Sequence, residues 1–261
     1  MSLLKINNLT HFFGGLRAVY NFNLELRGGE LMGLIGPNGA GKTTVFNLVS
    51  GFYRPSEGEI LFEGRGLNGL RPHAVTGLGM ARTFQNIRLW NSLTVFENLC
   101  VAQHYHLGYG FLQSVLRMSK FQKSERNVRK TAEEIIDLLG IRHYALEFPK
   151  NLPYGLQRRV EIGRALSLRP KLLMLDEPAA GMNPGEVEQL IELIRWIRDE
   201  FKLTVWLIEH HMRVVMNVCE RIKVIDFGEA IAEGTPAEIK QNRRVIKAYL
   251  GEEGPVHARG I

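Results

Sequence analysis

Short runs of mostly hydrophobic residues, each ending at glycine or at polar residues, recur along the chain. The runs at 30–35, 171–175 and 204–208 are shorter than typical helices, and their apolar character is typical of strands buried on both faces of a sheet. Stretches with helical spacing, such as 186–198, follow these runs. Strands that alternate with helices predict an α/β fold with a mixed, largely parallel sheet and right-handed crossovers.

The N-terminal part has a different pattern. Residues 3–9 and 20–26 are alternating or densely apolar, which predicts two strands of a small antiparallel sheet joined by a loop at 11–15. Residues 57–63 predict another strand, and residues 79–86 predict a short strand that runs into a polar loop. We therefore expect an N-terminal antiparallel β subdomain.

From residue 94 to about residue 141 the hydrophobic period is that of helices. Thr94 or Ser92 can cap the first of them, and the amphipathic stretch 132–139 ends at Gly140, a typical C-cap residue. Residues 111–118 repeat apolar side chains at helical spacing, which indicates packing or a partner contact rather than a cofactor site. This part predicts an α-helical subdomain inserted into the α/β core.

Composition narrows the class of protein. The 261 residues are 45% hydrophobic and 23% charged, which is ordinary for a globular domain, and no apolar run approaches the length of a bilayer span. The N-terminus lacks the apolar core of a secretory signal. Cys100 and Cys219 are far apart and lack metal-ligand spacing, so we expect free thiols. The net charge of +6 is spread along the chain, which gives no specific indication of a nucleic-acid partner.

One motif carries specific chemistry. The apolar run 30–35 leads into a glycine-rich turn with the pattern G-x-x-x-x-G-K-[ST], and helical spacing follows. In this context the backbone N–H groups point at an anion and the helix adds its positive end, which predicts a phosphate cradle for a nucleoside triphosphate. The lysine supplies a cation for the β- and γ-phosphates, and the next threonine is placed to ligate Mg²⁺. The residues of the motif are Gly36, Pro37, Asn38, Gly39, Ala40, Gly41, Lys42, Thr43 and Thr44.

Other polar residues stand where parallel strands end, which is where doubly wound folds bind ligands. Asp176 and Glu177 follow one buried run, and Glu209 and His210 follow another. Taken singly, these residues have simpler interpretations, because two acids can cap a helix and Gln85 can be a surface residue. Of the aromatic residues before the cradle, Phe12 and Phe13 are by themselves more typical of core than of a base-stacking platform.

The order of these motifs resembles that of the nucleotide-binding subunits of ABC transporters over nearly the whole chain. More narrowly, it resembles the larger of the paired ATP-binding subunits of bacterial branched-chain amino-acid importers. The narrower resemblance rests on six stretches, namely 14–16, 36–44, 82–86, 175–181, 208–210 and the tail from 233–236 through 248–251.

The resemblance implies a fold, which is a P-loop NTPase core in a single nucleotide-binding domain over 1–261. It places the α/β core with its β subdomain at 1–90 and 166–250, and the helical subdomain with the ABC signature at 91–165. We expect 251–261 to be a flexible tail.

The resemblance also implies roles in the hydrolysis of ATP with Mg²⁺. Glu177 polarises the attacking water, and His210 orients the γ-phosphate. Gln85 senses Mg²⁺ and the γ-phosphate, while Asp176 joins Thr43 in the Mg²⁺ shell through water. Phe13 takes the place of the aromatic residue that stacks on the base.

Tyr154 and Gly155 belong to the signature, which would act in trans in the site of a facing subunit. This signature departs from the usual Leu-Ser-Gly-Gly-Gln. Pro153 lacks the hydroxyl and the N–H of the usual serine, and Leu156 replaces the usual glutamine, although Gln157 follows. The departures put the closed dimer and its hydrolysis rate in doubt more than nucleotide binding.

The leading hypothesis is therefore the ATPase motor of an importer, with branched-chain amino acids as the default solute. Urea, amides and other small polar solutes remain open. The expected partners are a second, related ATP-binding subunit, transmembrane permease subunits and, indirectly, a solute-binding protein, with no nucleic acid. The expected location is the cytoplasmic face of a bacterial or archaeal membrane. A soluble ABC ATPase and a hydrolysis-impaired regulatory module are the alternatives.

Overall fold

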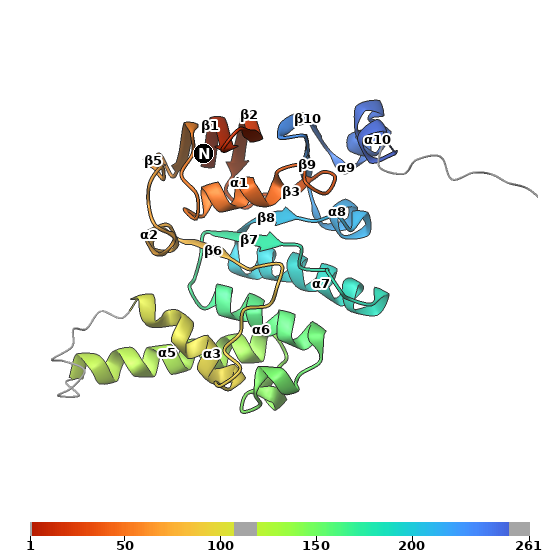
Figure 1. Cartoon of the computed structure of the whole chain (residues 1–261). Coiled ribbons are helices and arrows are strands. Elements are labelled where there is room, and N and C mark those ends of the chain that lie inside the picture. The colour runs from red at the N-terminus through yellow and green to blue at the C-terminus, as the bar shows by residue number, and fades with distance from the viewer. Residues whose placement is uncertain (1, 107–118, 251–261) are drawn as a thin grey trace, which may run out of the picture.

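The computed structural model describes residues 2–106 and 119–250, so the apolar stripe at 111–118 and the expected tail at 251–261 lie outside the described residues. Two sheets form the framework (Figure 1). A six-stranded sheet has the order β10-β9-β3-β8-β7-β6, and a four-stranded sheet has the order β2-β1-β4-β5. The expected α/β class, with a largely parallel sheet beside an antiparallel one, is confirmed.

In the six-stranded sheet only the edge strand β10 runs antiparallel to its neighbour. Every residue of β3, β7 and β8 is buried, as their continuous apolar runs predicted. The strands are β3 (Leu31–Ile35), β6 (Met80–Arg82), β7 (Leu172–Asp176), β8 (Thr204–Ile208), β9 (Arg221–Asp226) and β10 (Glu229–Gly234).

Side chains alternate along these strands and fill a separate hydrophobic cluster on each face of the sheet. On one face Phe46 lies against Trp206, with ring centroids 4.7 Å apart. On the other face Leu173 and Leu175 share a cluster with Ile194. The helices around the sheet are α1 (Lys42–Val49), α2 (Pro72–Gly77), α7 (Pro184–Phe201), α8 (Met212–Val218), α9 (Pro236–Gln241) and α10 (Arg243–Leu250).

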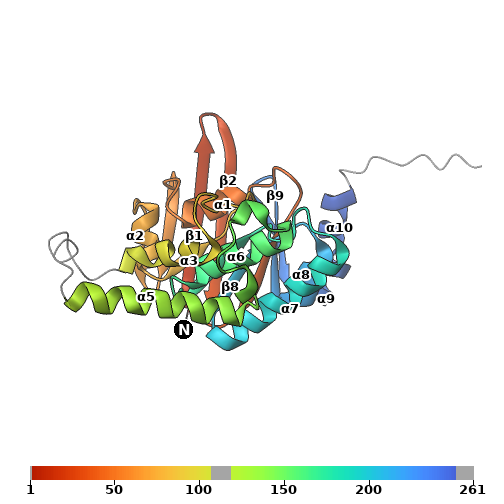
Figure 2. The same cartoon turned by 90° about the horizontal axis from the view of Figure 1, so that it is seen from below.

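The four-stranded sheet is antiparallel throughout. The expected loop at 11–15 is wrong in extent, because β1 continues to Phe13 and only Gly14 and Gly15 form the turn. Gly14 has φ 57°, a left-handed conformation that closes the hairpin within two residues. Figure 2 shows this hairpin extending beyond the other elements. The strands are β1 (Ser2–Phe13), β2 (Leu16–Arg27), β4 (Glu57–Phe62) and β5 (Arg65–Gly66).

The helices expected between 94 and 141 are present on either side of the undescribed segment. Thr94 and Glu97 form a capping box at the start of α3, and Gly140 has φ 65° just beyond α5, as their positions predicted. Gly163 lets α6 pack closely, since a Cβ there would lie 2.6 Å from Leu139 Cδ1. These elements are α3 (Val95–Ala102), η1 (Gln103–His106), α5 (Ser119–Leu138), η2 (Arg142–Tyr144), η3 (Pro149–Asn151) and α6 (Tyr154–Leu166).

None of the helices within residues 2–106 and 119–250 combines the length and the apolar character of a membrane span.

Candidate active site

The glycine-rich turn lies between β3 and α1, in the context that the motif required. At two of its positions the backbone passes where only glycine fits. A Cβ on Gly36 would come within 2.0 Å of the Ile225 carbonyl oxygen, and one on Gly41 within 2.5 Å of the Ala18 carbonyl oxygen. These contacts fix the turn against β9 and β2, so that α1 starts at Lys42 directly behind it.

A cleft of about 590 Å³ opens in front of this turn. Residues 38–44 line it from one side and Glu177 from another, and Phe13 and Arg17 of the hairpin complete the wall. Gly36 and Pro37 lie beneath, where their carbonyl oxygens accept hydrogen bonds of 2.6 and 2.8 Å from Lys42 Nζ. The expected cradle residues therefore lie together. Gly36 and Pro37 do not line the cleft but support Lys42 from below.

The cleft fits a triphosphate on the chemistry of its donors. Lys42 is 6% exposed, so its ammonium is held close to the turn, while the Thr43 side chain is exposed at the cleft wall. The start of α1 contributes unpaired N–H groups and the positive end of its dipole. An anion placed here would meet a cation, backbone donors and a hydroxyl.

Glu177 lies where three loops meet. Its backbone adopts φ 46°, and its N–H donates to the Ile208 carbonyl at 2.9 Å, which fixes the residue just beyond the end of β7. Its Oε2 accepts a 2.6 Å hydrogen bond from Gln85 Nε2 and lies 3.5 Å from His210 Nδ1. The structure therefore brings together three of the residues that were expected to act in catalysis.

Asp176 faces a different partner. Its carboxylate is 4% exposed and forms a 2.7 Å ion pair with Arg82 Nη2, while Arg82 Nη1 donates to Asn47 Oδ1 at 2.8 Å. Burial raises the pKa of Asp176, and the Arg82 guanidinium opposes that rise. No role was predicted for Arg82 by itself, although a charged residue in a short strand that is otherwise apolar could have indicated a buried partner.

The donor set suits Mg²⁺ rather than a metal held by the protein alone. Within residues 2–106 and 119–250, no cluster of three or more His, Cys, Asp or Glu side chains could hold a metal ion. Mg²⁺ in nucleotide sites takes one or two protein oxygens, with phosphate oxygens and waters completing the shell. A hydroxyl at Thr43 and a carboxylate at Asp176 are oxygen ligands of that kind.

Glu209 is a second residue whose role the sequence did not predict. It is fully buried, and its Oε1 accepts from the Ala179 N–H at 2.8 Å. Its Oε2 accepts from the N–H groups of His210 and His211 at 2.9 and 2.8 Å. Glu209 thus ties the loop after Glu177 to the loop that carries His210.

Phe13 lies at the cleft, but as the last residue of a strand rather than in the expected loop. Its ring packs edge-on against His11 and Tyr53, with centroids 4.7 and 5.3 Å away, and the side chain is 43% exposed. An aromatic surface is therefore available beside the cradle.

The signature residues Tyr154 and Gly155 form the start of α6 and are not among the described residues that line the cleft. Pro153 is the N-cap and makes no side-chain cap. The Gln157 amide donates to the Leu152 carbonyl at 2.9 Å, so it is already engaged and does not stand in for the glutamine missing at Leu156.

Comparison with known proteins identifies the family of the chain. The family model "ABC transporter" matches residues 19–180, and the model "Branched-chain amino acid ATP-binding cassette transporter" matches residues 231–255. The high-affinity branched-chain amino acid transport ATP-binding protein BraF of Pseudomonas aeruginosa is 46% identical over 250 residues, covering 96% of this chain and 98% of BraF. The corresponding protein LivG of Salmonella typhimurium is 47% identical over the same length and coverage.

Solved structures give the same result. A nucleotide-free ATP-binding cassette from an ABC transporter matches with a TM-score of 0.83 and 30% identity, covering 95% of this chain and 99% of that one. An ATP-binding cassette in its ADP conformation also matches with a TM-score of 0.83 and 30% identity, over 96% and 99% of the two chains. The chain belongs to the ABC transporter family, as one of its ATP-binding cassettes.

Proposed function

We propose that this cassette is the ATP-hydrolysing motor subunit of a membrane importer for branched-chain amino acids. The observation that carries the enzymatic part is the meeting of Gln85, Glu177 and His210 beside a cleft built for a triphosphate. Hydrolysis of a phosphoanhydride needs little covalent help from the protein, and it depends mainly on positioning and charge. The three side chains come from three separate loops, and Gln85 and His210 both approach the same carboxylate oxygen of Glu177, as positioning requires.

The contacts support a proposed role for each residue. Glu177 is the general base that polarises water, because its carboxylate lies at the cleft and its orientation is fixed by Gln85. His210 is near enough to the same oxygen to orient a phosphate or the water. Lys42 and the turn hold the triphosphate, and Phe13 stacks on the base. Thr43, and Asp176 through water, would hold Mg²⁺, which would neutralise phosphate charge.

A single copy has an incomplete site. Tyr154 and Gly155 lie outside the cleft, so a facing subunit would supply these signature residues in trans. Members of this family work with membrane subunits, and we infer a peripheral location at the cytoplasmic face of a bacterial or archaeal membrane. The second ATP-binding subunit would be a related chain, and a solute-binding protein would act indirectly.

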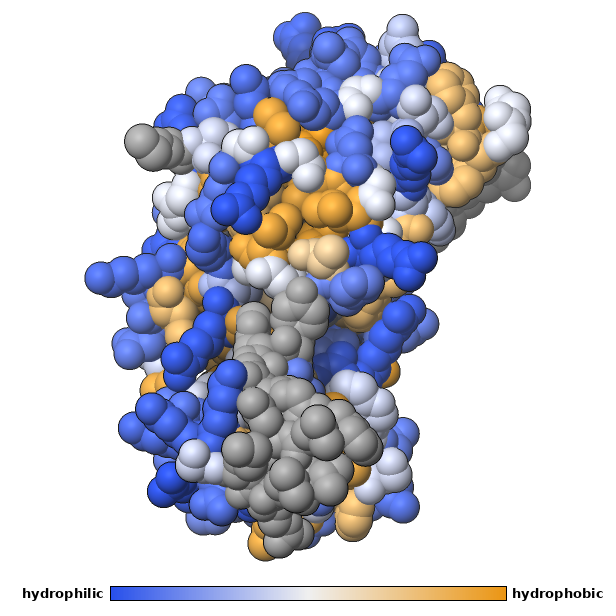
Figure 3. Space-filling model, turned by 90° about the vertical axis from the view of Figure 1, so that its left-hand side faces the viewer, coloured by the Kyte–Doolittle hydropathy of each residue, from blue (hydrophilic) through white to orange (hydrophobic). Residues whose placement is uncertain are grey.

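An aromatic surface next to Gln85 is suited to a membrane subunit. Phe52 is 46% exposed and packs edge-on against Phe84, with centroids 5.9 Å apart, and the Arg88 guanidinium lies 3.9 Å over the Phe84 ring. Exposed aromatic and arginine side chains are enriched in protein interfaces. Figure 3, which does not label these residues, shows that hydrophobic residues also gather between hydrophilic ones on the side of the molecule that lies at the left of Figure 1. A membrane subunit that binds Phe52 and Phe84 would contact the residue that immediately precedes Gln85.

The solute is proposed from the relatives, whose names specify branched-chain amino acids, and from the match of the C-terminal model. Urea, amides and other small polar solutes are the alternatives. The test is uptake of radiolabelled leucine, isoleucine, valine and urea by cells of the source organism without this gene. Complementation with the unchanged gene should restore amino-acid uptake.

The Lys42→Ala variant should fail to restore uptake, because it loses the cation of the cradle. Lys130→Ala, a change of the same kind at a side chain that is 77% exposed, is the control and should restore it. If the unchanged gene restores urea uptake in these cells but does not change their amino-acid uptake, the proposed solute is wrong. Full uptake with Lys42→Ala would overturn the role of the cradle.

A further inference from the structure

Two charged side chains of α6, Arg158 and Glu161, are buried in the interior. They are 0% and 1% exposed and form a 2.6 Å ion pair one turn apart. Removing two charges from water costs more than their attraction returns unless other hydrogen bonds satisfy them. The Nε–H of Arg158 has no partner among the described residues. Stability alone is therefore a weak reason for this pair, and its other contacts indicate what it does.

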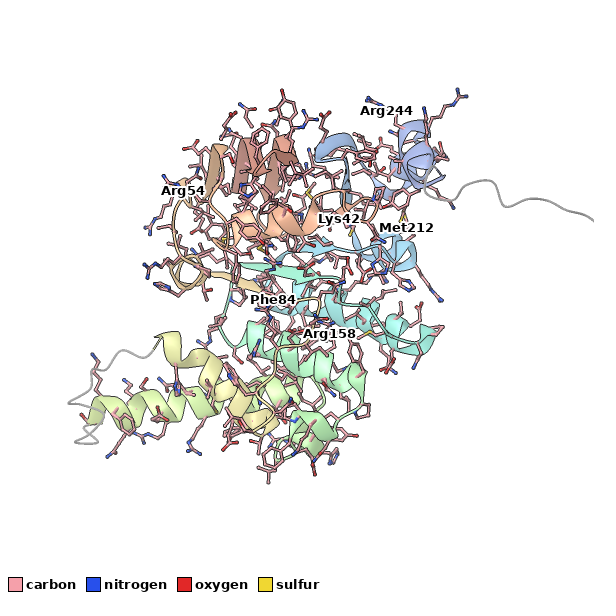
Figure 4. All side chains as sticks on the ribbon, in the orientation of Figure 1. Lys42, Arg54, Phe84, Arg158, Met212 and Arg244 are labelled. Carbon is pink, nitrogen blue, oxygen red and sulfur yellow. The ribbon has the colours of Figure 1, made fainter. Side chains whose placement is uncertain are left out.

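Most of those contacts are with the backbone of the loop that carries Gln85. Arg158 Nη1 donates to the Phe84 carbonyl and Nη2 to the Gln85 carbonyl, each at 2.7 Å. Glu161 Oε1 accepts from the N–H of Arg88 at 3.3 Å and, at the limit of hydrogen bonding, from that of Phe84 at 3.5 Å. Figure 4 shows Arg158 next to Phe84, between the sheet and the helices. One helix thus holds both ends of the loop.

The same guanidinium also reaches the signature. Arg158 Nη2 donates a second hydrogen bond, at 2.9 Å, to the Tyr154 hydroxyl. On the far side of the loop, the Gln85 side chain donates to Glu177. Three hydrogen bonds therefore connect Tyr154 to Glu177. Arg158 binds both the Tyr154 hydroxyl and the Gln85 carbonyl, and the side chain of the same glutamine binds Glu177.

We propose that Arg158, braced by Glu161, is a positioning residue that couples the Gln85 loop to the signature residue Tyr154. The proposal rests on the roles proposed above for Gln85 in this chain's site and for Tyr154 in the facing one. A movement of the signature helix would displace the Gln85 carbonyl through one rigid group. The planar fork of arginine makes these bonds simultaneously, which the single ammonium of lysine does not reproduce.

The test uses the full chain, and its variants Arg158→Lys and Tyr154→Phe, assembled with the partner subunits of the transporter, because the site is complete only there. For each, fluorescence titration with a labelled ATP gives affinity, phosphate release gives kcat and KM, and hydrogen exchange reports residues 84–88. Arg159→Lys is the matched control, because Arg159 is the next residue on α6 and contacts the Leu139 carbonyl and Gln189 rather than the loop.

We expect Arg158→Lys to lower kcat at least about tenfold, with ATP affinity within about twofold of the parent. Exchange in 84–88 should become faster. Arg159→Lys should leave all three unchanged. Tyr154→Phe should have a smaller effect that disappears in the Arg158→Lys background, since the two changes break the same path.

A parental kcat and parental exchange in Arg158→Lys would overturn the proposal, as would strictly additive effects of the two changes. Gln85→Ala separates this failure from failure of the proposed function. If Gln85→Ala loses turnover while Arg158→Lys does not, only the coupling is wrong. If Gln85→Ala keeps full turnover, the role proposed for Gln85 is wrong, and the coupling through it is overturned as well.

Discussion

Gln85 donates a 2.6 Å hydrogen bond to Glu177, a residue 92 positions further along the chain. The bond spans two strands of one sheet, because the Gln85 loop follows β6 and Glu177 follows β7, and these strands are parallel neighbours. Parallel neighbours end at the same edge, so the loops after them meet. The pairing of these two strands thus brings together Gln85 and Glu177, the two residues for which we propose roles in hydrolysis.

The substitution Glu177→Gln tests the role of that carboxylate. The amide has the same shape but cannot act as a base, so we expect turnover to fall by about 100-fold or more. ATP affinity should stay near the parent value, because Lys42 and the turn are untouched. Phosphate release and fluorescence titration measure the two quantities separately. Glu186→Gln, the same change at the cap of α7, is the control, and parental turnover in Glu177→Gln would show that the base is another residue.

The sequence predicted individual elements better than their contacts. The bounds of β8 agree with the expected strand at 204–208, because a continuous apolar run needs no partner information to be recognised. The extent of β1 was underestimated, since its last residues are polar or aromatic and continue as a strand only through pairing with β2.

The residues of the candidate site also fall into those that the sequence predicted and those that it did not. The cradle could be predicted because its residues are adjacent in sequence and its chemistry is local. Arg82, Arg158 and Glu209 could not, because their partners lie far along the chain and only the packing of strands and helices shows that they are buried.

Gly36→Ala tests the backbone contact beneath the cradle. A Cβ would lie 2.0 Å from the Ile225 carbonyl oxygen, which belongs to a central strand and cannot give way. We expect a loss of about 3 kcal/mol in the free energy of unfolding, or about 6 to 12 °C in Tm. Thermal unfolding followed by circular dichroism measures it. Gly66→Ala, where a Cβ meets no atom within 4 Å, is the control. An unchanged Tm for Gly36→Ala would contradict this description of the turn.

The two thiols should be slow to react in the folded protein. Burial raises the pKa of Cys100 to about 11 and also raises that of Cys219. At pH 8 the Cys100 thiol therefore remains protonated, whereas an unshifted thiol is partly thiolate. We expect its alkylation by iodoacetamide to be about 100-fold slower than that of a free thiol, and to accelerate as the pH rises toward 11. Peptide mass spectrometry measures each site, with the urea-unfolded chain as control, and fast labelling of native Cys100 at pH 7 would refute the expectation.

The two departures in the signature should have opposite effects on stability. Pro153 is an exposed N-cap without a side-chain acceptor, so Pro153→Ser should add about 1 kcal/mol by capping α6. Leu156 is half-buried and packs against the hydrophobic cluster, so Leu156→Gln should lose apolar packing and lower stability, although the small cavity beside it has both apolar and polar lining residues. We expect Tm to rise by about 2 to 4 °C for the first variant and to fall for the second. ATP affinity of the isolated chain should be the same in both, since neither residue lines its cleft. A Tm that falls for Pro153→Ser would show that the rigid proline, rather than a missing cap, determines the start of this helix.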